Sequence, residues 1–230
     1  MIYFIYTEYM KSEFRVALFD LDGTLINTES QYTEFWERVG AELNLNIPNL
    51  PQIIKGRTLT SIFSNFIPSK ELQKEITLRL DLFESQMQFP FYPGVLEFLE
   101  DLRRNGVRCA VVTSSNKAKM AAVKRKIPNF DDLFDKVLTA EDFSASKPDP
   151  ACYLYGAQVF SAKKSQCVVF EDAVNGLRAG VSAGMFTIGF ATTNPRQVIA
   201  PLCHHVQDDF LHLSYADVQK LLAAYWKDKD

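Results

Sequence analysis

The sequence predicts an α/β fold in which a doubly wound parallel sheet carries an inserted helical domain. Short apolar runs alternate with helical patterns along the chain, which is typical of a parallel sheet covered by helices. The interval between the first two predicted strands is also far longer than the roughly 30 residues of a strand–helix–strand unit. The predicted buried strands are Val16–Phe19, Cys109–Val112, Lys136–Leu138, Cys167–Phe170 and Phe186–Phe190.

Clear start and stop signals mark the helices between these strands. Pro93–Gly94 opens one helix, and Asn105–Gly106 closes it. A second helix is expected to begin with Asp149 as its cap and Pro150 at its first helical position. A third is expected from about Ala173 to Ala183. Each of these helices lies next to a predicted strand, as the doubly wound arrangement requires.

The long interval predicts a second, helical domain at residues 28–90, inserted into a core domain made of residues 1–27 and 91–230. A proline-containing stretch at 46–52 is expected to link its helices. Two apolar stripes at helical spacing support this division: Tyr32, Phe35, Trp36, Val39 and Leu43 form one, and Leu72, Ile76, Leu80, Phe83 and Met87 form the other.

Composition excludes several classes of protein. The 230 residues are 47% hydrophobic and 23% charged, which is ordinary for a globular chain and excludes disorder, collagen and coiled coil. The formal net charge of -3 argues against a dedicated nucleic-acid binder. No stretch reaches the roughly 20 apolar residues of a membrane helix. Residues 1–10 lack the features of a signal peptide and are expected to be an extension or an edge strand.

The four cysteines predict a reducing, cytoplasmic environment. They stand alone at positions 109, 152, 167 and 203, with no Cys-x-x-Cys spacing that would suggest a zinc site or a redox pair. Three of them lie in or beside apolar runs, where a buried free thiol is the expected state. The three histidines near the C-terminus do not follow a predicted strand, so surface or packing roles are expected for them.

Polar side chains follow four of the predicted strands. Asp20-Leu21-Asp22-Gly23-Thr24 follows the first, and Thr113-Ser114-Ser115-Asn116 follows the second. Lys147 lies in the loop after the third, and Glu171-Asp172 follows the fourth. Ligands of open α/β sheets bind outside the carboxyl ends of the strands. We therefore expect all four groups to face one crevice.

The acidic residues of this crevice predict a divalent cation. Asp20 and Asp22 share a face of an extended segment, and Glu171 and Asp172 add further negative charge. Close carboxylates repel one another unless a cation or a shared proton relieves them. Magnesium is commonly held by one or two carboxylates together with substrate phosphate. Lys147 and the Thr113 hydroxyl would then suit the phosphate oxygens.

Each motif also has a purely structural interpretation. Asp-x-Asp-Gly can be a capped turn, and Thr113-Ser114-Ser115-Asn116 can cap the next helix. Lys147 can be a solvated loop lysine, and Glu171-Asp172 can be favourable charge at a helix start. The combination of one such group at each successive strand end is what favours a catalytic site.

These four stretches resemble the motifs of the haloacid dehalogenase superfamily of phosphotransferases. Phe19–Leu25 is similar to the first motif and Val111–Asn116 to the second. Ser146–Pro150 resembles the third motif in the subgroup that contains sugar-phosphate phosphatases and β-phosphoglucomutase, and Val169–Gly176 resembles the fourth. The resemblance implies a Rossmann-like core, and it implies that the helical insert is the cap domain of that subgroup.

The resemblance also implies a role for each matching residue. Asp20 would be the nucleophile that forms an aspartyl-phosphate, and Asp22 the general acid and base. The cofactor would be Mg²⁺, held by Asp20, the Asp22 backbone carbonyl and Asp172, with Glu171 in or near the coordination shell. Thr113, Ser114 and Lys147 would stabilise the transferring phosphoryl group, with Ser115 and Asn116 also predicted to bind phosphate or substrate.

Two positions distinguish a phosphatase from a mutase within this resemblance. β-Phosphoglucomutase-like enzymes carry a histidine early in the first cap helix, where this chain has Tyr32, and an arginine where it has Leu59. Lys55-Gly56-Arg57 instead resembles the cap loop of simple phosphatases and is predicted to contact substrate; a solvated Arg57 is the alternative. Asp22 is absent from the dehalogenases of the superfamily, which argues against dehalogenation.

The predicted function is a magnesium-dependent phosphatase that acts on a small phosphorylated metabolite, with a sugar phosphate as the expected substrate. A hexose-phosphate mutase and a non-catalytic phosphometabolite-binding module are the alternatives. The expected partner is a small-molecule phosphate ester, with no nucleic acid and no membrane. A monomer or a weak dimer is expected.

Overall fold

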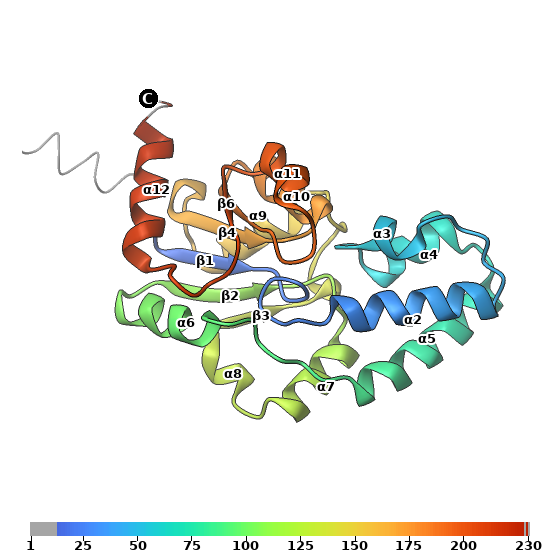
Figure 1. Ribbon diagram of the computed structural model, residues 1–230. Helices are drawn as coiled ribbons and strands as arrows, with labels where there is room; N and C mark the ends of the chain where they lie inside the picture. Colours follow the sequence, from blue (N-terminus) through green and yellow to red (C-terminus); the bar gives the residue numbers. More distant parts are fainter. Residues whose placement is uncertain (1–12, 228, 230) are drawn as a thin grey trace, which may run out of the picture.

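A computed structural model describes residues 13–227 and 229, and it contains a six-stranded parallel sheet (Figure 1). The strand order is β3-β2-β1-β4-β5-β6, so β1 lies between the two halves of the sheet. The expectation for residues 1–10 lies outside the described residues. The strands are β1 Val16–Phe19, β2 Arg108–Val112, β3 Lys136–Leu138, β4 Cys167–Glu171, β5 Phe186–Phe190 and β6 His205–Gln207.

The sheet confirms the predicted α/β fold class and adds one strand. The five predicted strands are present, and β2 and β4 are each one residue longer than expected. The sixth strand, β6, was not predicted. Its sequence, HVQ, has a single apolar residue, and all three of its residues are only partly buried at the edge of the sheet. An edge strand of this kind carries neither the apolar run nor the alternation that identifies a strand in sequence.

Alternate residues of the central strand enter two separate hydrophobic layers. Ala17 and Phe19 belong to the cluster that packs under α6 (Val95–Arg104) and α12 (Tyr215–Lys227). Val16 and Leu18 belong to the cluster that packs under α9 (Ala151–Val159) and α10 (Val174–Ser182). Because successive side chains of a strand point to opposite faces, β1 is buried on both sides. The buried position of β1 sets the position of Asp20, which follows it directly.

Helices of the core cover both faces of the sheet (Figure 1). The helix after Asp149 begins one residue later than predicted, because Pro150 is the capping residue rather than the first helical one. The Asp149 side chain does cap it, by accepting a hydrogen bond from the Ala151 amide at 2.9 Å. The core helices are α6 Val95–Arg104, α7 Lys117–Lys126, α8 Phe130–Leu133, α9 Ala151–Val159, α10 Val174–Ser182, α11 Arg196–Ile199 and α12 Tyr215–Lys227, and three short 3₁₀ helices cover Ala140–Asp142, Lys164–Gln166 and Ala200–Leu202.

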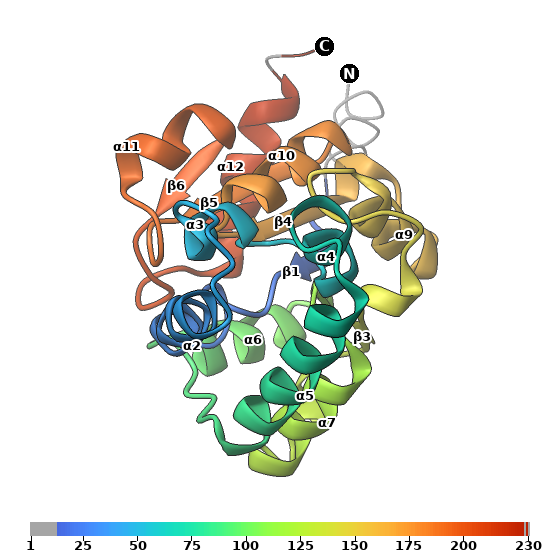
Figure 2. The same cartoon turned by 90° about the vertical axis from the view of Figure 1, so that its right-hand side faces the viewer.

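The inserted segment forms a helical cap over the carboxyl end of the sheet. Viewed from that side, its helices lie in front of β1 (Figure 2). They share a hydrophobic core of their own, built on Phe35, Trp36, Ile76 and Leu80. The cap helices are α2 Glu29–Glu42, α3 Leu50–Ile54, α4 Leu59–Phe66 and α5 Lys70–Gln86.

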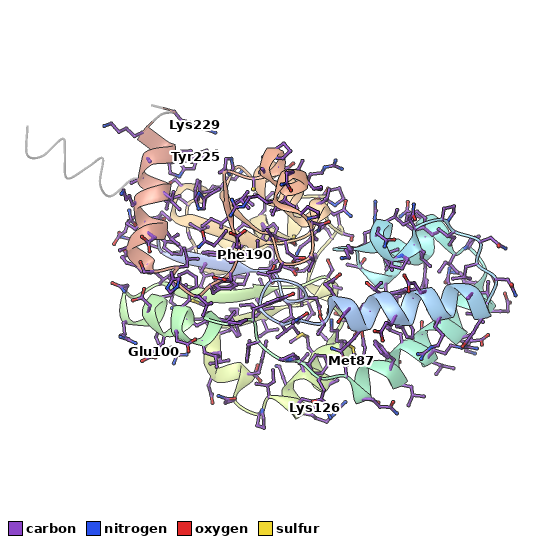
Figure 3. The ribbon with its side chains drawn as sticks, in the orientation of Figure 1. Met87, Glu100, Lys126, Phe190, Tyr225 and Lys229 are labelled. Atoms are coloured by element: carbon purple, nitrogen blue, oxygen red, sulfur yellow. The ribbon has the colours of Figure 1, made fainter. Side chains whose placement is uncertain are left out.

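Two details of the cap differ from the sequence prediction. Part of the expected linker at 46–52 is helical, since α3 begins at Leu50 with Pro51 in its first turn, where proline is tolerated. Met87, which was assigned to the second apolar stripe, follows the end of α5 and packs into the core domain's cluster instead (Figure 3). Residues just past a helix end no longer follow the helical period, so the stripe could not place it.

Two adjacent connections join the cap to the core. The Asn27 amide donates to the Pro90 carbonyl at 2.8 Å, and the Tyr92 amide donates to the Leu25 carbonyl at 3.0 Å. Both bonds lie at the two ends of the inserted segment. The domain boundary at 28–90 stays a prediction. Among the described residues, no helix combines the length and apolar character needed to cross a membrane.

Candidate active site

The four predicted groups meet at the carboxyl end of the sheet. Asp20 follows β1, Thr113 follows β2, and Glu171 is the last residue of β4. Since β1 lies between β2 and β4, these three residues come from neighbouring strands at the point where the strand order reverses. Lys147 reaches them from the loop after β3. The side chains that follow these strands therefore come together at one edge of the sheet.

Lys147 is at the centre of this group. Its ammonium lies 2.6 Å from Asp20 Oδ1 and 2.8 Å from Glu171 Oε1, and it also donates to the Val112 carbonyl at 3.2 Å. The residue is only 2% exposed. Burial alone would lower the pKa of Lys147, but Asp20 and Glu171 outweigh burial and raise that pKa well above its usual value. The lysine is thus a fixed positive charge beside Asp20 and is not a solvated loop residue.

Glu171 anchors Lys147 and shapes the start of α10. Its Oε1 accepts from Lys147 and from the Tyr153 hydroxyl, and its Oε2 accepts from the Asp172 and Ala173 amides at 2.8 and 2.7 Å. A Cβ atom at position 176 would lie 1.5 Å from Glu171 Oε1, so only glycine fits there. Both carboxylate oxygens are already engaged, which makes this residue more a support for Lys147 than a free ligand.

Three buried carboxylates crowd one point of the crevice. Asp20, Glu171 and Asp172 each offer an oxygen within 4.8 Å of the others. Burial raises the pKa of Asp20 to about 8, with Lys147 opposing the shift and Glu171 adding to it. Burial, followed by repulsion from Glu171 and Asp20, also raises the pKa of Asp172 well above its usual range.

These residues fit a hard divalent cation. When all three carboxyl groups are ionised, they and the one ammonium leave an excess of two negative charges, which such an ion would balance. Carboxylate oxygens are the ligands that Mg²⁺ prefers. Asp172 is held ready by the Thr24 hydroxyl at 2.8 Å and by the Thr193 hydroxyl. Gly23 allows this approach, since its φ is +86° and a Cβ there would lie 2.4 Å from Asp172 Oδ2.

Asp22 points away from this cluster and toward the cap. The Thr28 hydroxyl donates to its Oδ1 at 2.5 Å, and the Ser115 hydroxyl donates to its Oδ2 at 3.0 Å. Lys119 of α7 forms an ion pair with the same Oδ2. Asp20 and Asp22 therefore face different environments, one beside the buried cluster and the other in the space between core and cap.

The four residues that follow β2, at positions 113–116, have different hydrogen-bond partners. Thr113 is 1% exposed, and its hydroxyl accepts from the Ser115 amide at 3.0 Å. Ser114 donates to the Gly56 carbonyl of the cap at 3.0 Å, while Ser115 holds Asp22. Asn116 caps α7 by accepting from the Lys119 amide at 2.8 Å. Capping, which the sequence offered as the structural alternative, is therefore what the Asn116 side chain does here.

The cap loop Lys55-Gly56-Arg57 lies over the crevice and lines the pocket. Core residues hold its backbone: Asn175 donates to the Lys55 carbonyl at 2.9 Å, and Ser146 accepts from the Thr58 amide at 3.0 Å. The Lys55 ammonium pairs with Glu29 at 3.0 Å. The Arg57 guanidinium lies 5.7 Å from the centre of the Phe66 ring.

One pocket joins the core and cap residues. It is lined by Asp20, Asp22 and Thr113 of the core and by residues of α2, α3 and α5 from the cap. Sequence reasoning missed three charged residues of its wall: Glu29, Glu84 and Lys119. Each lies on a helix that otherwise shows ordinary amphipathic spacing. For Glu84 the sequence did contain a sign of burial, since this residue falls four positions after Leu80 on the buried face of α5.

His204 takes part in packing, as expected for the histidines. Its Nδ1 accepts a hydrogen bond from the Thr187 amide at 2.9 Å, and its ring stacks on Phe186. It lies at the β5–β6 side of the sheet, outside the pocket lining.

Comparison with known proteins agrees with this site. The model of the haloacid dehalogenase-like hydrolase family matches residues 17–190, which include the strand-end residues from Asp20 to Asp172. The chain belongs to that family. The family resemblance inferred from the four motifs is therefore confirmed, and so is the class of enzyme, a hydrolase.

Relatives of this hydrolase include named phosphatases. Validoxylamine A 7'-phosphate phosphatase of Streptomyces hygroscopicus subsp. limoneus is 31% identical over 196 residues, which cover 81% of this chain and 90% of the relative. Hexitol phosphatase A of Escherichia coli is 30% identical over 178 residues, covering 74% of this chain and 80% of the relative.

Solved structures share the fold of core plus cap. A family IA hydrolase from Entamoeba histolytica superposes with a TM-score of 0.79 at 21% identity, covering 90% of this chain and 99% of that one. A β-phosphoglucomutase from Clostridium difficile superposes with a TM-score of 0.77 at 21% identity, covering 93% and 99%. At this identity the likeness concerns the fold alone.

Proposed function

We propose that this protein is a magnesium-dependent phosphatase that hydrolyses a small phosphorylated metabolite of the sugar-phosphate class through an aspartyl-phosphate. The observation that carries the proposal is the separation of Asp20 from Asp22. Asp20 lies beside Lys147 in the carboxylate cluster, and Asp22 lies between core and cap. Two carboxylates in different environments can take two different roles in one reaction.

In the first step, an oxygen of Asp20 attacks the phosphorus of the ester. The bond between phosphorus and the leaving oxygen breaks as the Asp20 oxygen–phosphorus bond forms, and Asp22 gives its proton to the leaving oxygen. We expect Lys147, the Thr113 hydroxyl and the Ser114 amide to neutralise charge on the phosphoryl oxygens.

In the second step, Asp22 takes a proton from a water molecule that attacks the phosphorus. The Asp20 oxygen–phosphorus bond breaks, inorganic phosphate leaves, and Asp20 is again a free carboxylate. A Mg²⁺ ion held by Asp20 and Asp172, with the Asp22 backbone carbonyl and Glu171 as further candidates, would supply the positive charge that lets a carboxylate approach a phosphate dianion.

Tyr32 favours the phosphatase over the mutase alternative. The subgroup's mutases have a histidine where this chain has Tyr32, and they have Leu59 replaced by an arginine that holds the second phosphate. Here the Tyr32 hydroxyl donates to Glu84 at 2.7 Å, so it is engaged with a carboxylate of the cap.

The deciding experiment is hydrolysis of p-nitrophenyl phosphate by the native protein, with Mg²⁺ and with EDTA, beside Asp20→Asn. We expect turnover that both EDTA and the substitution abolish. Asp132→Asn, a change of an exposed aspartate outside the pocket, is the matched control and should keep full activity. Turnover that survives Asp20→Asn would contradict the proposed nucleophile.

A second assay distinguishes the alternatives. β-Glucose 1-phosphate is supplied, and both inorganic phosphate and glucose 6-phosphate are measured. Release of phosphate without glucose 6-phosphate is the expected result. Formation of glucose 6-phosphate would indicate the mutase, and binding of phosphate without any turnover would indicate the binding module.

A further inference from the structure

The cap side of the pocket contains a buried carboxylate that the mechanism above does not use. Glu84 is 5% exposed, yet it lies on the face of α5 that otherwise buries Ile76 and Leu80. The three residues follow one another at intervals of four, so they occupy one stripe of the helix. Ile76 and Leu80 belong to the cap's hydrophobic core, whereas Glu84 lines the pocket.

Tyr32 of α2 orients this carboxylate. Its hydroxyl donates to Glu84 Oε1 at 2.7 Å. A carboxylate can accept hydrogen bonds at both of its oxygens, so one bond from Tyr32 leaves acceptor capacity for a ligand. The Tyr32 and Trp36 rings also line the pocket and give it an apolar wall. An acceptor beside an aromatic wall suits a molecule that presents hydroxyl groups on a carbon skeleton.

The lysines of the pocket wall are already paired with carboxylates. Lys119 forms an ion pair with Asp22, and its ammonium lies 4.4 Å from the centre of the Tyr32 ring. Lys55 pairs with Glu29 at 3.0 Å. A second anionic group on a substrate would have to displace one of these carboxylates from its lysine.

Arg57 is the remaining cation of the wall, and it too is engaged within the cap. Its Nε donates to the Ile53 carbonyl at 3.1 Å, and its guanidinium lies against the Phe66 ring. Any anionic group of a substrate that reached the cap side of the pocket would also meet the negative charge of Glu84. Charge repulsion by Glu84 and competition for the lysines therefore both disfavour a substrate with a second anionic group.

We propose that Glu84, oriented by Tyr32, is a specificity-determining residue that selects uncharged, polyhydroxylated leaving groups and rejects substrates with a second anionic group. The proposal rests on the proposed phosphatase function, and it narrows the substrate class to phosphate monoesters of neutral polyols and sugars. Glu84 accepts a hydrogen bond from a substrate hydroxyl, and it repels a carboxylate or second phosphate at the same place.

A matched pair of substrates tests this. Glucitol 6-phosphate and 6-phosphogluconate have the same carbon chain length and the same phosphate, and they differ at carbon 1, which is a hydroxymethyl group in one and a carboxylate in the other. We expect the full chain with Mg²⁺ to prefer glucitol 6-phosphate by at least about tenfold in kcat/KM. A preference for 6-phosphogluconate, or for a hexose bisphosphate over its monophosphate, would overturn the proposal.

The variant that decides the role of Glu84 is Glu84→Gln, which removes the charge and keeps the shape. We expect the preference for glucitol 6-phosphate to shrink by at least about tenfold, because the amide no longer repels the carboxylate. An equal change for both sugar substrates would mean that Glu84 has only a structural role and would overturn the proposal.

Two further variants complete the test. Glu37→Gln changes an exposed glutamate of α2 and should leave the selectivity unchanged. Tyr32→Phe removes the orienting hydrogen bond and should reduce the preference in the same direction as Glu84→Gln; it decides the question if Glu84→Gln does not fold. Failure of the phosphatase function would appear differently, as a lack of Mg²⁺- and Asp20-dependent hydrolysis of every substrate.

Discussion

Lys119 and Asp22 form an ion pair beneath the cap, although 97 positions separate them in the chain. The lysine is 3% exposed and the Asp22 side chain is 16% exposed, so the pair lies at the boundary between the core domain and the pocket. The Asp22 Oδ2 that pairs with Lys119 also accepts from the Ser115 hydroxyl, and the Thr28 hydroxyl donates to Asp22 Oδ1. Three side chains thus fix the direction in which Asp22 points.

The first prediction concerns Lys119→Met. It should lower kcat toward a sugar phosphate by about 10- to 100-fold, because a general acid and base contributes only when it is correctly placed. Stability should change little, since Asp22 is partly exposed and can be hydrated. Steady-state kinetics with a thermal melt would check both expectations. Lys117→Met, on an exposed lysine of the same helix, is the control, and an unchanged kcat in Lys119→Met would show that the pair is incidental.

The second prediction concerns the carboxylate cluster. Mg²⁺ should raise the melting temperature of the native protein, because a ligand that binds only the folded state stabilises it by mass action. In Asp172→Asn that Mg²⁺-dependent increase should be lost. Without metal, the same variant should melt above the native protein, since it removes a carboxylate that burial, Glu171 and Asp20 all disfavour.

Thermal melts with Mg²⁺ and with EDTA would measure both effects. Asp132→Asn should keep the native response to Mg²⁺, as its side chain is exposed and lies outside the cluster. If Asp172→Asn kept the full increase, the ion would be bound elsewhere or by the other carboxylates alone.

The strand ends could be predicted from sequence because they depend on local order. Asp20 follows an apolar run, and a parallel sheet brings the ends of such runs to one edge. The same rule predicts that Lys147 and Glu171 lie at this edge, but the ion pair between them was not predicted. Lys119 and Glu84 could not be found in this way, because each enters the pocket only through the angle at which its helix packs. Helical spacing identifies the buried face of α5, but it does not say what that face meets.

The third prediction uses the pKa of Glu84, which burial raises from 4.5 to about 6, with Lys119 opposing the shift. A carboxyl group with a raised pKa in the folded state binds protons more tightly there than in the unfolded chain. Its favourable contribution to folding is therefore present below about pH 4.5 and is lost as the pH rises through about 6. Glu84→Gln lacks this titration.

Measured against the native protein, Glu84→Gln should gain stability as the pH is raised from 4 to 7. A shift of this size corresponds to about 2 kcal/mol in the difference between the two free energies of unfolding. Urea unfolding at several pH values would measure that difference. Glu37→Gln, on an exposed residue, should show no such trend, and a flat difference for Glu84→Gln would mean that the native glutamate is no harder to ionise than in the unfolded chain.

The last prediction concerns Gly176, which lies in α10 directly against Glu171. A Cβ at this position would be 1.5 Å from Glu171 Oε1 and 2.0 Å from its Cδ. Because the carboxylate is held by Lys147 and two backbone amides, it cannot move aside without breaking those bonds. Gly176→Ala should therefore destabilise the fold by about 1–3 kcal/mol and displace Lys147 from Asp20, with a large loss of activity.

Gly40→Ala is the matched comparison, since it is also a glycine within a helix. The nearest atom to a Cβ there is Leu50 Cδ2 at 4.0 Å, which is ordinary contact. Alanine should therefore stabilise α2 by about 0.5–1 kcal/mol, as expected when a helical glycine is replaced without a clash. If urea unfolding shows that Gly176→Ala lowers the free energy of unfolding and Gly40→Ala raises it, the effect of Gly176→Ala arises from its clash with Glu171. Equal destabilisation by both would contradict the argument, because helix propensity and free space both favour alanine at position 40.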